Sequence, residues 1–592
     1  MTITLTDPLG RLITAPGPGD DPGDILGRLT ATELVAVDTE TTGVAWHDTL
    51  RTVQLGTAEE ALVLRADLEE HMEPLREWFA TTHMPLTAHN AGFDIRMLVN
   101  AGLAGHRGLW DRMIDTQILD QLLRPGDGWT KPEHGLKPAT LTWCGDSATA
   151  ADAKAELTAW WRSLGIKTDA AGWRDCPLDG EPYLLYGAAD VFDGVALATT
   201  LLPMVDELIG REVREREHRI ARLVHGITMR GMRIDTAAAE ADASAAEAEV
   251  AVMREQLVSK YGIENPGSPK QLLAWFADRG ISLTSTSEGT LTVEQLGGEA
   301  ASFRDELLAW REKSKAAGTY LRKLADTPAD ADGVPRLHPD FGTLDARTGR
   351  MASRGPNMQN FPPDLRKYVL AEQGSVLVDA DFSAVEVRVA AGFAQDAALT
   401  DTFVQGRDPY VAAAEAAWGP APDPETTKAN RKKAKPLLLG HIYGRGPNNI
   451  ATALGVGREE AEHLQQRLND AMPQVPKYVA RSRATVSTGR TAGRLPSGRV
   501  VQVHPATQYT AAVNSVVQGA GRELLVDALL VLDDAGFADN IWMPIHDEWI
   551  LQVPEDQADE VCRVLERAMT SRVGQVPITA EAGVMGACWG KM

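Results

Sequence analysis

The stretch SVLVDADFSAVEVRVAA, residues 375–391, decides the fold of the C-terminal part of this 592-residue chain. Its first part is a run of apolar residues typical of a buried strand, and from about Val385 the apolar residues recur with the spacing of a helix. Asp381 lies where the strand gives way to a turn at Phe382 and Ser383. The stretch therefore predicts a strand, a turn and a helix, with a carboxylate at the end of the strand.

A second acidic stretch follows far along the chain. In WMPIHDEWILQV, residues 542–553, the residues His546, Asp547 and Glu548 separate two apolar runs. This pattern predicts a β-hairpin with acids at its tip. The strand-like runs flank a helical, basic segment that includes RKKAKPLLLGHIYGRG at 431–446. We predict an α+β domain with a helical insertion.

The earlier part of the chain is organised differently. The first 200 or so residues alternate short apolar runs, such as LVAVDTETTG at 34–43 and RTVQLGT at 51–57, with helical patterns. This alternation predicts a mixed α/β sheet domain. From about Leu208 to Lys323 the pattern is almost wholly helical. The length agrees with several packed units, because 592 residues exceed what one hydrophobic core usually supports.

The net charge of −23 is unusual for a protein that binds nucleic acid. The basic residues are nevertheless concentrated: six of them and no acid lie between Thr427 and Arg445, and six against none lie between Lys477 and Arg499. Solvated faces are the alternative interpretation of such blocks. Two blocks in one acidic chain favour a basic groove.

The chain has no sequence feature of export or membrane insertion. No window approaches the roughly 18 continuous apolar residues that a membrane span needs, and the N-terminus lacks a basic region followed by an apolar stretch. The four cysteines are scattered singly, without the spacing of a zinc site or a disulfide framework. We expect a cytoplasmic protein with reduced cysteines and no membrane contact.

Two acids end an apolar run near the N-terminus. In VAVDTETTG, residues 35–43, Asp38 and Glu40 are two apart and therefore lie on the same face of a strand. Neighbouring carboxylates repel each other, and a cation held between them is the usual compensation. A solvated strand end is the other interpretation of a lone Asp-x-Glu. Two further segments carry polar residues in helical patterns: Asn90, Phe93 and Asp94 in HNAGFDIRML, and Tyr186 and Asp190 in YLLYGAADVFDG.

In this order and at these spacings, the three segments resemble the Exo I, Exo II and Exo III motifs of the DEDDy 3′→5′ exonucleases. The resemblance implies that Asp38, Glu40, Asp94 and Asp190 hold two divalent cations and that Tyr186 orients the attacking water. Hard oxygen ligands suit Mg²⁺ or Mn²⁺, and two such metals can generate hydroxide and stabilise the leaving 3′ oxygen. Every carboxylate of the pattern is present, which implies an active proofreading exonuclease.

The segments 375–391, 431–446 and 542–553 resemble motifs A, B and C of family A DNA polymerases, and they occur in that order. The likeness extends over nearly the whole chain, through NPGSPKQL at 265–272, ARTGRMASRGPNMQNFP at 346–362 and NSVVQGAGREL at 514–524. It starts directly at the exonuclease segments. We therefore expect the separate 5′ nuclease domain of many bacterial DNA polymerase I proteins to be missing.

The resemblance implies a fold and a domain order. It implies an α/β exonuclease domain of the ribonuclease H-like kind, followed by an α+β right-hand polymerase domain with palm, fingers and helical thumb. We expect the exonuclease domain over 1–207 and the polymerase domain over 208–592. The expected subdomains are a thumb at about 208–335, a palm at about 336–395 and 500–592, and fingers at about 396–499.

The family's roles transfer to individual residues of the polymerase segments. Asp381 and Asp547 would bind the two Mg²⁺ ions of the synthetic site, with Glu548 as a secondary acid. Arg431 and Lys435 would meet the triphosphate of the incoming nucleotide.

Further residues would contact the nucleotide and the DNA. Tyr443 and Leu439 would lie beside the incoming nucleotide and the templating base, and Glu386 resembles the steric gate that excludes a 2′-hydroxyl. The remaining matches are to positions that touch the primer terminus and the template in the minor groove: Arg350, Asn514, Gln518 and His546.

Several positions depart from the family's pattern. The family usually has Asn where this chain has Leu438 and an aromatic residue where it has Leu439, which leaves sugar discrimination open. Pro436 falls inside the expected helix, where proline removes a hydrogen bond and tends to kink the chain. Asp379 adds an acid two residues before Asp381, where it either perturbs metal affinity or forms a salt bridge.

The sequence thus predicts template-directed DNA synthesis from dNTPs with proofreading, in phage or bacterial DNA replication. The expected cofactor is Mg²⁺, two per active site, with Mn²⁺ as an alternative; the expected partners are primer-template DNA and dNTPs. We expect a monomer, located in the bacterial host cell if a phage encodes it. One alternative is a repair or translesion polymerase, and another is a DNA-binding exonuclease with a silenced polymerase site.

Overall fold

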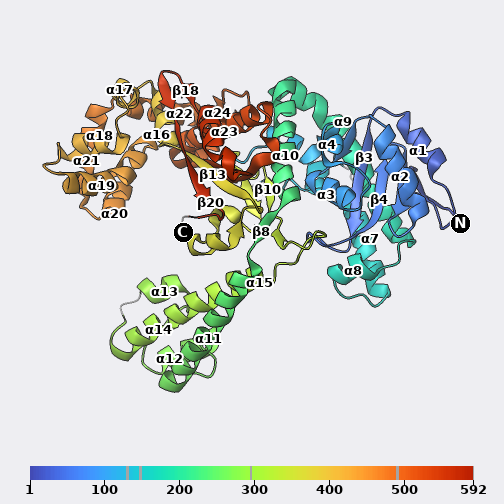
Figure 1. Cartoon of the computed structure of the whole chain (residues 1–592), viewed down its shortest axis with the longest axis horizontal. Helices are drawn as coiled ribbons and strands as arrows, with labels where there is room; N and C mark the ends of the chain where they lie inside the picture. The colour runs from blue at the N-terminus through green and yellow to red at the C-terminus, as the bar shows by residue number, and fades with distance from the viewer. Residues whose placement is uncertain (128–131, 146–149, 294–295, 488–492, 591–592) are drawn as a thin grey trace.

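The computed structural model describes residues 1–127, 132–145, 150–293, 296–487 and 493–590. Figure 1 shows a sheet-based domain at one end of the molecule, a second sheet in the middle, a helical lobe at the other end and a helical arm that projects from the centre. We name these parts the N-terminal domain (1–205), the central domain (336–395 and 500–590), the basic lobe (397–487) and the helical arm (236–325).

The N-terminal domain is built on a seven-stranded mixed sheet with the strand order β1-β2-β5-β4-β3-β6-β7. Its strands are β1 (Ile3–Thr6), β2 (Leu12–Ala15), β3 (Val35–Thr41), β4 (Leu50–Gly56), β5 (Glu60–Arg65), β6 (Leu86–Ala88) and β7 (Met113–Asp115). Strand β3 pairs antiparallel with β4 and parallel with β6. This mixed α/β sheet confirms the fold predicted for the first part of the chain.

Helices cover both faces of this sheet. They are α1 (Gly23–Thr30), α2 (Glu69–Thr81), α3 (Gly92–Asn100), α4 (His106–Trp110), α5 (Thr116–Leu123), α6 (Leu136–Cys144), α7 (Ala150–Ser163), α8 (Asp169–Asp175) and α9 (Glu181–Val205). Val35 and Val37 of β3 join one hydrophobic cluster, whereas Ala36 joins the cluster formed with the first half of α9. Because side chains alternate along a strand, Asp38 and Glu40 face the same side as Ala36, toward α9.

One long helical run connects the N-terminal domain to the rest of the chain. Helix α9 continues through a π-helical turn, Asp206–Gly210, into α10 (Arg211–Arg230). The boundary expected between residues 207 and 208 falls within this turn. By length and composition the run Glu181–Arg230 could cross a membrane, but 67% of its most apolar window is buried inside the protein, as in a core helix. Helix α10 packs against α3, α4 and α5 on one side and against the central domain on the other.

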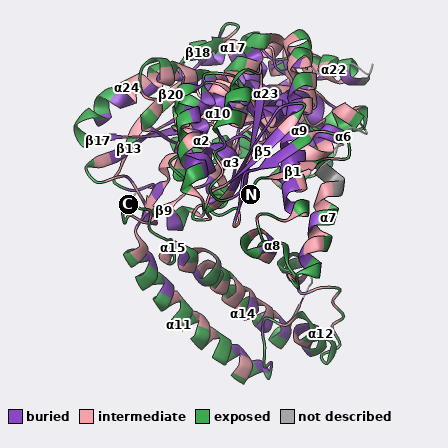
Figure 2. Cartoon of the chain, turned by 90° about the vertical axis from the view of Figure 1, so that its right-hand side faces the viewer, coloured by how far each residue is buried: buried purple, intermediate pink, exposed green. Residues whose placement is uncertain are grey.

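The helical arm has a small core of its own. It contains α11 (Thr236–Tyr261), α12 (Pro269–Ala277), α13 (Glu288–Val293), α14 (Gly298–Lys315), a π-helical turn (Ala316–Leu321) and α15 (Arg322–Ala325). The rings of Tyr261, Trp275 and Phe303 meet there, with 4.2 Å between the ring centres of Trp275 and Phe303. Figure 2 shows α11 and α14 as largely exposed, in contrast to the buried strands of the N-terminal domain. The helical region predicted from about Leu208 to Lys323 thus divides between this arm and α10.

The central domain is built on a four-stranded antiparallel sheet with the order β16-β17-β13-β20. These strands are β13 (Ser375–Phe382), β16 (Ile541–Ile545), β17 (Glu548–Pro554) and β20 (Ala580–Gly586). Helices α16 (Val385–Ala394), α23 (Gln508–Asp534) and α24 (Ala558–Ala568) pack around it. The strand, turn and helix predicted from residues 375–391 are present, with α16 beginning at Val385.

Short strands join the parts of the chain. They are β8 (Met232–Ile234), β9 (Arg336–Leu337), β10 (Asp340–Gly342), β11 (Ala352–Arg354), β12 (Val369–Leu370), β14 (Gly493–Arg494), β15 (Val500–Val501), β18 (Ser571–Val573) and β19 (Val576–Ile578). Strand β8 lies between β12 and β9 in a small sheet, so the segment before the arm pairs with the segments after it.

The basic lobe is formed by six helices inserted between α16 and α23. They are α17 (Ala397–Val404), α18 (Pro409–Trp418), α19 (Pro424–Ile442), α20 (Pro447–Leu454), α21 (Arg458–Ala471) and α22 (Gln474–Ser487). Helix α19 continues through Pro436 without a break. The α+β domain with a helical insertion, predicted from the sequence, is therefore confirmed.

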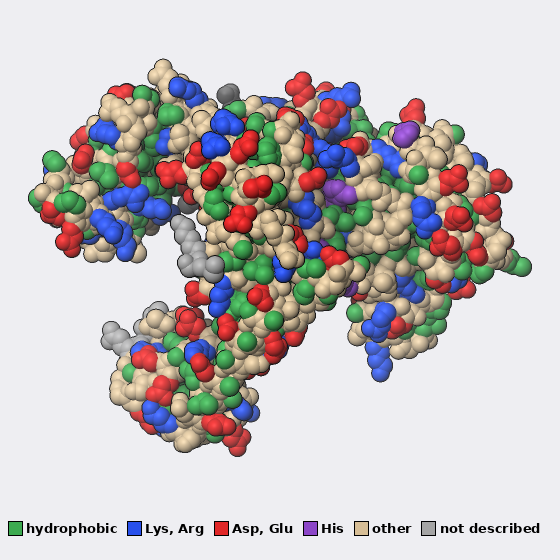
Figure 3. Space-filling model, in the orientation of Figure 1, with side chains coloured by type: hydrophobic (Ala, Val, Ile, Leu, Met, Phe, Trp, Pro, Cys, Tyr) green, Lys and Arg blue, Asp and Glu red, His purple; other side chains and the backbone are tan. Residues whose placement is uncertain are grey.

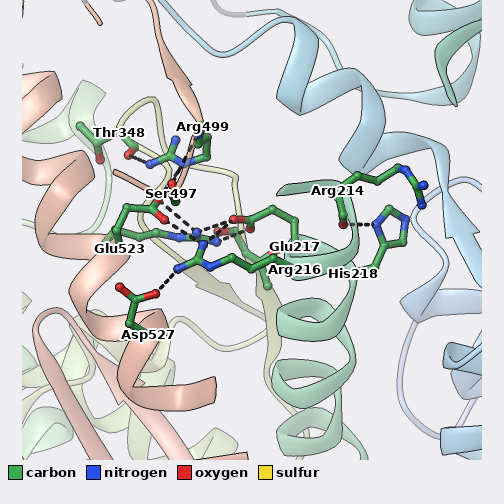
Figure 4. A network of polar contacts seen from close by, with 11 residues as sticks. Arg214, Arg216, Glu217, His218, Thr348, Ser497, Arg499, Glu523 and Asp527 are labelled. Carbon is green, nitrogen blue, oxygen red and sulfur yellow. Dashed lines mark hydrogen bonds and ion pairs between the residues drawn. The ribbon is translucent and has the colours of Figure 1, made fainter. Parts of the chain in front are cut away.

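A buried network of ion pairs joins α10 to α23 (Figure 4). Arg522 donates two hydrogen bonds to Glu217, of 2.6 and 2.8 Å, and both side chains are buried. The neighbouring Glu523 accepts from Arg216 at 2.8 Å and from Arg499 at 2.9 Å. Burying charges is expensive unless they are paired in good geometry. The network thus fixes how α23 lies against α10.

Candidate active sites

Two acidic stretches that are far apart in the sequence meet at the end of the central sheet. Asp381 on β13 lies opposite Glu548 on β17. Asp547 lies in the turn between β16 and β17, and its carbonyl accepts a hydrogen bond of 3.3 Å from the N–H of Phe382. His546 has a φ of +50°, a left-handed conformation that allows the tight turn. The predicted hairpin therefore presents its acids beside the end of β13.

Crowding raises the pKa values of these carboxyls. The pKa of Asp381 is raised to about 6, first by partial desolvation and then by the charge of Asp547. Burial also raises the pKa of Asp547, although Arg350 opposes it. The pKa of Glu548 is raised to about 8 by burial and then by Asp379 and Asp381. A cation bound among acids that repel one another in this way would favour their ionised forms.

Asp379 precedes Asp381 by two residues on β13. Its charge raises the pKa of both Glu548 and Asp381. The two possibilities for Asp379, an effect on metal affinity and a salt bridge, both stay open.

Glu386 is the centre of a polar network at these acids. One of its oxygens accepts from Nη2 of Arg350 at 3.1 Å and from Nε2 of Gln518 at 3.5 Å. The other accepts from the hydroxyl of Tyr443 at 2.5 Å. Arg350 Nη2 also lies 3.1 Å from Oδ1 of Asp547. Glu386 is thus salt-bridged to Arg350 within the group of acids.

Arg499 fixes the backbone next to Arg350. The carbonyl of Thr348 accepts a hydrogen bond of 3.0 Å from Arg499, which is also paired with Glu523. Gly349 has a φ of +79°, and a Cβ atom there would lie 2.4 Å from the guanidinium of Arg499. Only glycine fits this backbone conformation and this close approach. The network of Figure 4 therefore extends to the backbone beside Arg350.

Four residues of the basic lobe form a stripe at intervals of four along and just beyond α19. Arg431 and Lys435 are exposed, whereas Leu439 and Tyr443 are half-buried. Residues four apart share one face of a helix. Tyr443, at the end of the stripe, donates a hydrogen bond to Glu386, so this face meets the central domain beside the acids, and the charge of Lys435 lowers the pKa of Asp381. Figure 3 shows Lys and Arg side chains gathered over α19 and α20, beside a wide opening between the basic lobe and the helical arm.

Arg431 and Lys435 are supported by the neighbouring helix α18. Nε of Arg431 lies 2.7 Å from Oδ2 of Asp408. The ring centre of Tyr410 lies 5.4 Å from the guanidinium of Arg431 and 5.9 Å from Nζ of Lys435. Leu438, by contrast, is fully buried in the core. The departure from Asn at this position therefore changes the packing beneath the stripe, and Leu439 is the one of the two leucines that lies on it.

The residues predicted to contact DNA lie around the same acids. Gln518 and Asn514 are both half-buried and lie four apart on α23. Gln518 reaches Glu386, and Asn514 lies one turn earlier. His546 is exposed in the hairpin turn, and its charge lowers the pKa of Asp547.

A second group of acids lies in the N-terminal domain, between β3 and α9. Carboxylate oxygens of Asp38, Glu40 and Asp190 all lie within 4.8 Å of one another. Asp94, at the start of α3, accepts a hydrogen bond of 2.7 Å from the hydroxyl of Thr39. The structure thus brings three of the four predicted ligands into one cluster, with Asp94 close enough to raise the pKa of Asp38.

Burial and mutual repulsion act on this group as well. Burial raises the pKa of Asp94 to about 7 and that of Asp190 to about 6. It also raises the pKa values of Asp38 and Glu40 well above their usual range, with further repulsion from Asp94 and Asp190 respectively. Burial and the nearby acids raise the pKa of Tyr186 too, so its hydroxyl stays protonated.

The turn before α3 is fixed by another buried acid. Asn90 has a φ of +61°, and its N–H and that of Ala91 each donate a hydrogen bond of 3.0 Å to the carboxylate of Asp115. His218 on α10 accepts from the N–H of Asp115 at 2.9 Å. Asp115 thus sets where α3 begins and where Asp94 lies.

Comparison with known proteins assigns a family model to each of the two parts of the chain. Residues 236–591 match the family model described as DNA polymerase family A, and residues 19–206 match the model described as 3′-5′ exonuclease. The chain belongs to DNA polymerase family A. This family A polymerase carries its exonuclease domain before its polymerase domain, so it combines template-directed DNA synthesis with proofreading, as predicted from the motif segments.

Individual relatives of the polymerase cover nearly the whole chain. The DNA polymerase of Mycobacterium phage D29 is 28% identical, over 94% of this chain and 93% of its own, and that of phage L5 is 27% identical over the same shares. The DNA polymerase I of Aquifex aeolicus is 27% identical over 95% and 97%. A solved structure, the POL domain of Pol1 from M. smegmatis in complex with DNA primer-template and dNTP, superimposes with a TM-score of 0.72 at 21% identity over 98% of this chain and 99% of that one. It confirms the fold.

The acids of this polymerase fit divalent metal ions. Family A polymerase and exonuclease domains generally use such ions. At the exonuclease cluster, Oδ1 of Asp190 is buried and has no hydrogen-bond partner among the described residues. Carboxylate oxygens are the ligands that hard divalent cations prefer. A cation there would satisfy this oxygen and offset the repulsion between the acids.

The sequence analysis missed two lysines of the polymerase's exonuclease site. Nζ of Lys137 on α6 lies 3.3 Å from the hydroxyl oxygen of Tyr186. Nζ of Lys154 on α7 lies 4.3 Å from the ring centre of Trp173 and 5.6 Å from that of Tyr186. Both lie outside the three exonuclease motif segments, and no local pattern marks either residue. Only the packing of α6 and α7 on α9 brings them to the acids.

Proposed function

We propose that the central site builds DNA from dNTPs by two-metal nucleotidyl transfer and that the N-terminal site trims the primer by two-metal hydrolysis. The observation that carries the synthetic half is the convergence of Asp381 and Asp547 with the stripe of α19. These residues come from three separate segments of the chain. Acids that would hold cations thus face cationic side chains that would hold phosphates.

The donor sets define which residues would hold the metals. Each site would hold two Mg²⁺ ions, with Mn²⁺ as an alternative. The ligands would be Asp381 and Asp547 in the central domain, and Asp38, Glu40, Asp94 and Asp190 in the N-terminal domain. The ions would supply Lewis-acid activation of the nucleophile and stabilisation of the leaving group.

In synthesis, the residues of the basic lobe bind and orient the nucleotide. Arg431 and Lys435 neutralise the triphosphate through charge-assisted hydrogen bonds. Tyr443 and Leu439, farther along the stripe, lie against the base and sugar. Glu386 is fixed beneath the sugar by its three partners, where a 2′-hydroxyl would meet its carboxylate.

In proofreading, the primer end lies against β3 and α9. The hydroxyl of Tyr186 orients the water that attacks the terminal phosphodiester. Asp115 keeps the turn at Asn90 rigid, so that Asp94 keeps its place beside Asp38. Holding the reacting groups in one geometry contributes much of the rate in such reactions.

The DNA and the biological setting follow from the surface and the relatives. The M. smegmatis neighbour is described with DNA primer-template and dNTP, and the opening beside α19 and α20 offers the corresponding place in this chain. Arg350, Asn514, Gln518 and His546 would contact the primer terminus and the template. The mycobacteriophage relatives support a role in phage DNA replication, by a monomer in the cytoplasm of a bacterial host.

Two substitutions test the assignment of two separate sites. Asp381→Ala should abolish primer extension with Mg²⁺ and four dNTPs while leaving degradation of the primer without dNTPs intact. Asp38→Ala should do the reverse. Asp556→Ala, at an exposed acid of the same domain, is the control and should keep most of the extension rate. If either Asp381→Ala or Asp38→Ala abolished both activities in a folded protein, the assignment of two independent sites would be wrong.

A further inference from the structure

Lys137 contacts the exonuclease site although no motif segment contains it. It is the second residue of α6, and its Nζ lies 3.3 Å from the hydroxyl oxygen of Tyr186 and 4.4 Å from the centre of that ring. Helix α6 packs along α9, which carries Tyr186 and, one turn later, Asp190. An ammonium group has only donors, so Lys137 donates this hydrogen bond and the phenolic oxygen accepts it.

The hydroxyl of Tyr186 is held by Lys137. Its oxygen accepts a hydrogen bond of 3.3 Å from Nζ of Lys137. A phenolic hydroxyl has one proton and rotates about one bond, so the proton is directed away from the ammonium group and stays free to be donated. The ring is fixed as well, because Trp173 packs against it with 5.5 Å between the ring centres. The site therefore contains a pre-oriented hydroxyl.

Lys137 is directed at this hydroxyl rather than at a carboxylate. Its charge lowers the pKa values of Asp38, Glu40 and Asp190. Within the part of the chain that the structure describes, however, its side chain forms a hydrogen bond with Tyr186 and no ion pair with these acids. A role in neutralising the acids alone would not require contact with the tyrosine oxygen.

We propose that Lys137 is a positioning residue for the exonuclease reaction and acts through Tyr186. By occupying the acceptor side of the phenolic oxygen, it makes the hydroxyl a hydrogen-bond donor with a fixed direction. A water that accepts this proton keeps a lone pair free to attack the phosphorus. The proposal rests on the role given above to Tyr186 as the residue that orients the water.

Lys154 provides a matched control. It brings the same charge to two of these acids, since it lowers the pKa values of Glu40 and Asp190. Its Nζ lies against the rings of Trp161 and Trp173, at 4.6 and 4.3 Å, and 3.7 Å from Asp169. Lys154 also lies 5.6 Å from the ring centre of Tyr186, a contact that Tyr186→Phe preserves. The two lysines therefore differ in the hydrogen bond to the hydroxyl, which is the feature under test.

The test is a double-mutant cycle on the full-length protein. Single-turnover degradation of a single-stranded oligonucleotide is measured with Mg²⁺ for the wild type, Lys137→Met, Tyr186→Phe and the double variant. Lys137→Met should lower the maximal single-turnover rate constant by about 10- to 100-fold with little change in the half-saturating enzyme concentration, because a slightly misplaced water reacts slowly. In the Tyr186→Phe background the same substitution should have almost no further effect, since residues that act through one another are not additive.

Two further measurements separate positioning from charge and from folding. Lys137→Arg should restore most of the rate, whereas Lys154→Met should give a loss that adds to that of Tyr186→Phe. Primer extension by Lys137→Met should equal that of the wild type, which shows that the chain is folded. Binding of the oligonucleotide in EDTA, followed by fluorescence anisotropy, should be unchanged, because the proposed role involves no phosphate contact.

Each contrary result overturns the proposal in a recognisable way. Additive losses in the cycle would show that Lys137 does not act through Tyr186. Weaker oligonucleotide binding with a smaller salt dependence would make it a phosphate ligand instead. A wild-type rate for Lys137→Met would remove any role. If Asp38→Ala itself left degradation intact, the proposed exonuclease site would be wrong, and this outcome is distinct from the failures of Lys137 alone.

Discussion

Tyr443 donates a hydrogen bond to Glu386, with 2.5 Å between the phenolic oxygen and Oε2. Tyr443 ends α19 of the basic lobe and Glu386 begins α16 of the central domain, so this bond joins the two parts beside the catalytic acids. Arg350 and Gln518 hold the other oxygen of the same carboxylate. The position of Glu386 is therefore fixed from three directions.

A fixed carboxylate beneath the sugar predicts how the enzyme selects its substrate. Glu386→Ala should raise the incorporation of a ribonucleotide relative to the matching deoxyribonucleotide by about 10- to 100-fold, because the side chain that meets the 2′-hydroxyl is removed. The ratio of kcat/KM for dATP and ATP on a primed template measures this change.

The matched control for this prediction is Glu386→Gln. Glutamine keeps the volume of the side chain and loses the ion pair with Arg350, so it should keep most of the discrimination while lowering kcat. Equal loss of discrimination in both variants would show that charge, rather than volume, selects the sugar.

The stripe on α19 predicts which lysine binds the triphosphate. Lys435→Ala should lower kcat/KM for dNTP by about 100-fold, since a charge-assisted contact to the developing negative charge is lost. Lys433 is exposed on the opposite face of the same helix, and Lys433→Ala should change kcat/KM by less than about threefold. Comparable losses in the two variants would place the nucleotide elsewhere.

The acids of the two candidate sites were predictable because each stands at a recognisable place in a short apolar pattern. Asp381 ends an apolar run, Asp547 lies between two such runs, and the spacing of Asp38 and Glu40 sets their common face. Such signals are local, since a strand or a hairpin leaves its period in a few residues. The fold class followed from the same patterns and from the order of the motifs.

Contacts between distant segments were not predictable in this way. The bridge from Arg350 to Asp547 joins residues 197 positions apart, and Lys137 meets Tyr186 across 49 positions. Nothing in the sequence near either residue records its partner. The sequence of α10 likewise has the pattern of an exposed charged helix and does not predict that its Glu217 is fully buried against Arg522.

That buried pair predicts a large effect on stability. Arg522→Met removes both short hydrogen bonds of the buried Glu217 and leaves it only the 3.2 Å contact with Arg216, so it should lower the free energy of unfolding by about 3 kcal/mol. Replacing both residues by methionine should cost less, because no uncompensated charge remains. Urea unfolding followed by tryptophan fluorescence measures the difference.

The control for the buried pair is an exposed one of similar length. Arg458 and Glu462 lie 2.8 Å apart on the surface of α21, and Arg458→Met should change the free energy of unfolding by less than about 1 kcal/mol. If Arg522→Met were as mild as Arg458→Met, the network of Figure 4 would not be what holds α23 against α10.

The raised pKa values at the exonuclease cluster predict how metal binding affects stability. Asp94 and Asp190 have folded pKa values of about 7 and 6, above the ordinary value of 3.8. A group with a raised folded pKa contributes stability that is fully present below its unfolded pKa and is lost as the pH rises through the folded pKa. The metal-free protein should therefore lose stability as the pH rises from about 4 through 7.

Because a bound cation offsets the repulsion, Mg²⁺ should raise the Tm relative to EDTA more at pH 8 than at pH 5. Asp190→Asn removes one of the charges and one ligand, so it should raise the Tm in EDTA at pH 8 and reduce the gain from Mg²⁺. An equal Mg²⁺-dependent gain in Tm at both pH values, unchanged by Asp190→Asn, would show that these acids do not bind the metal.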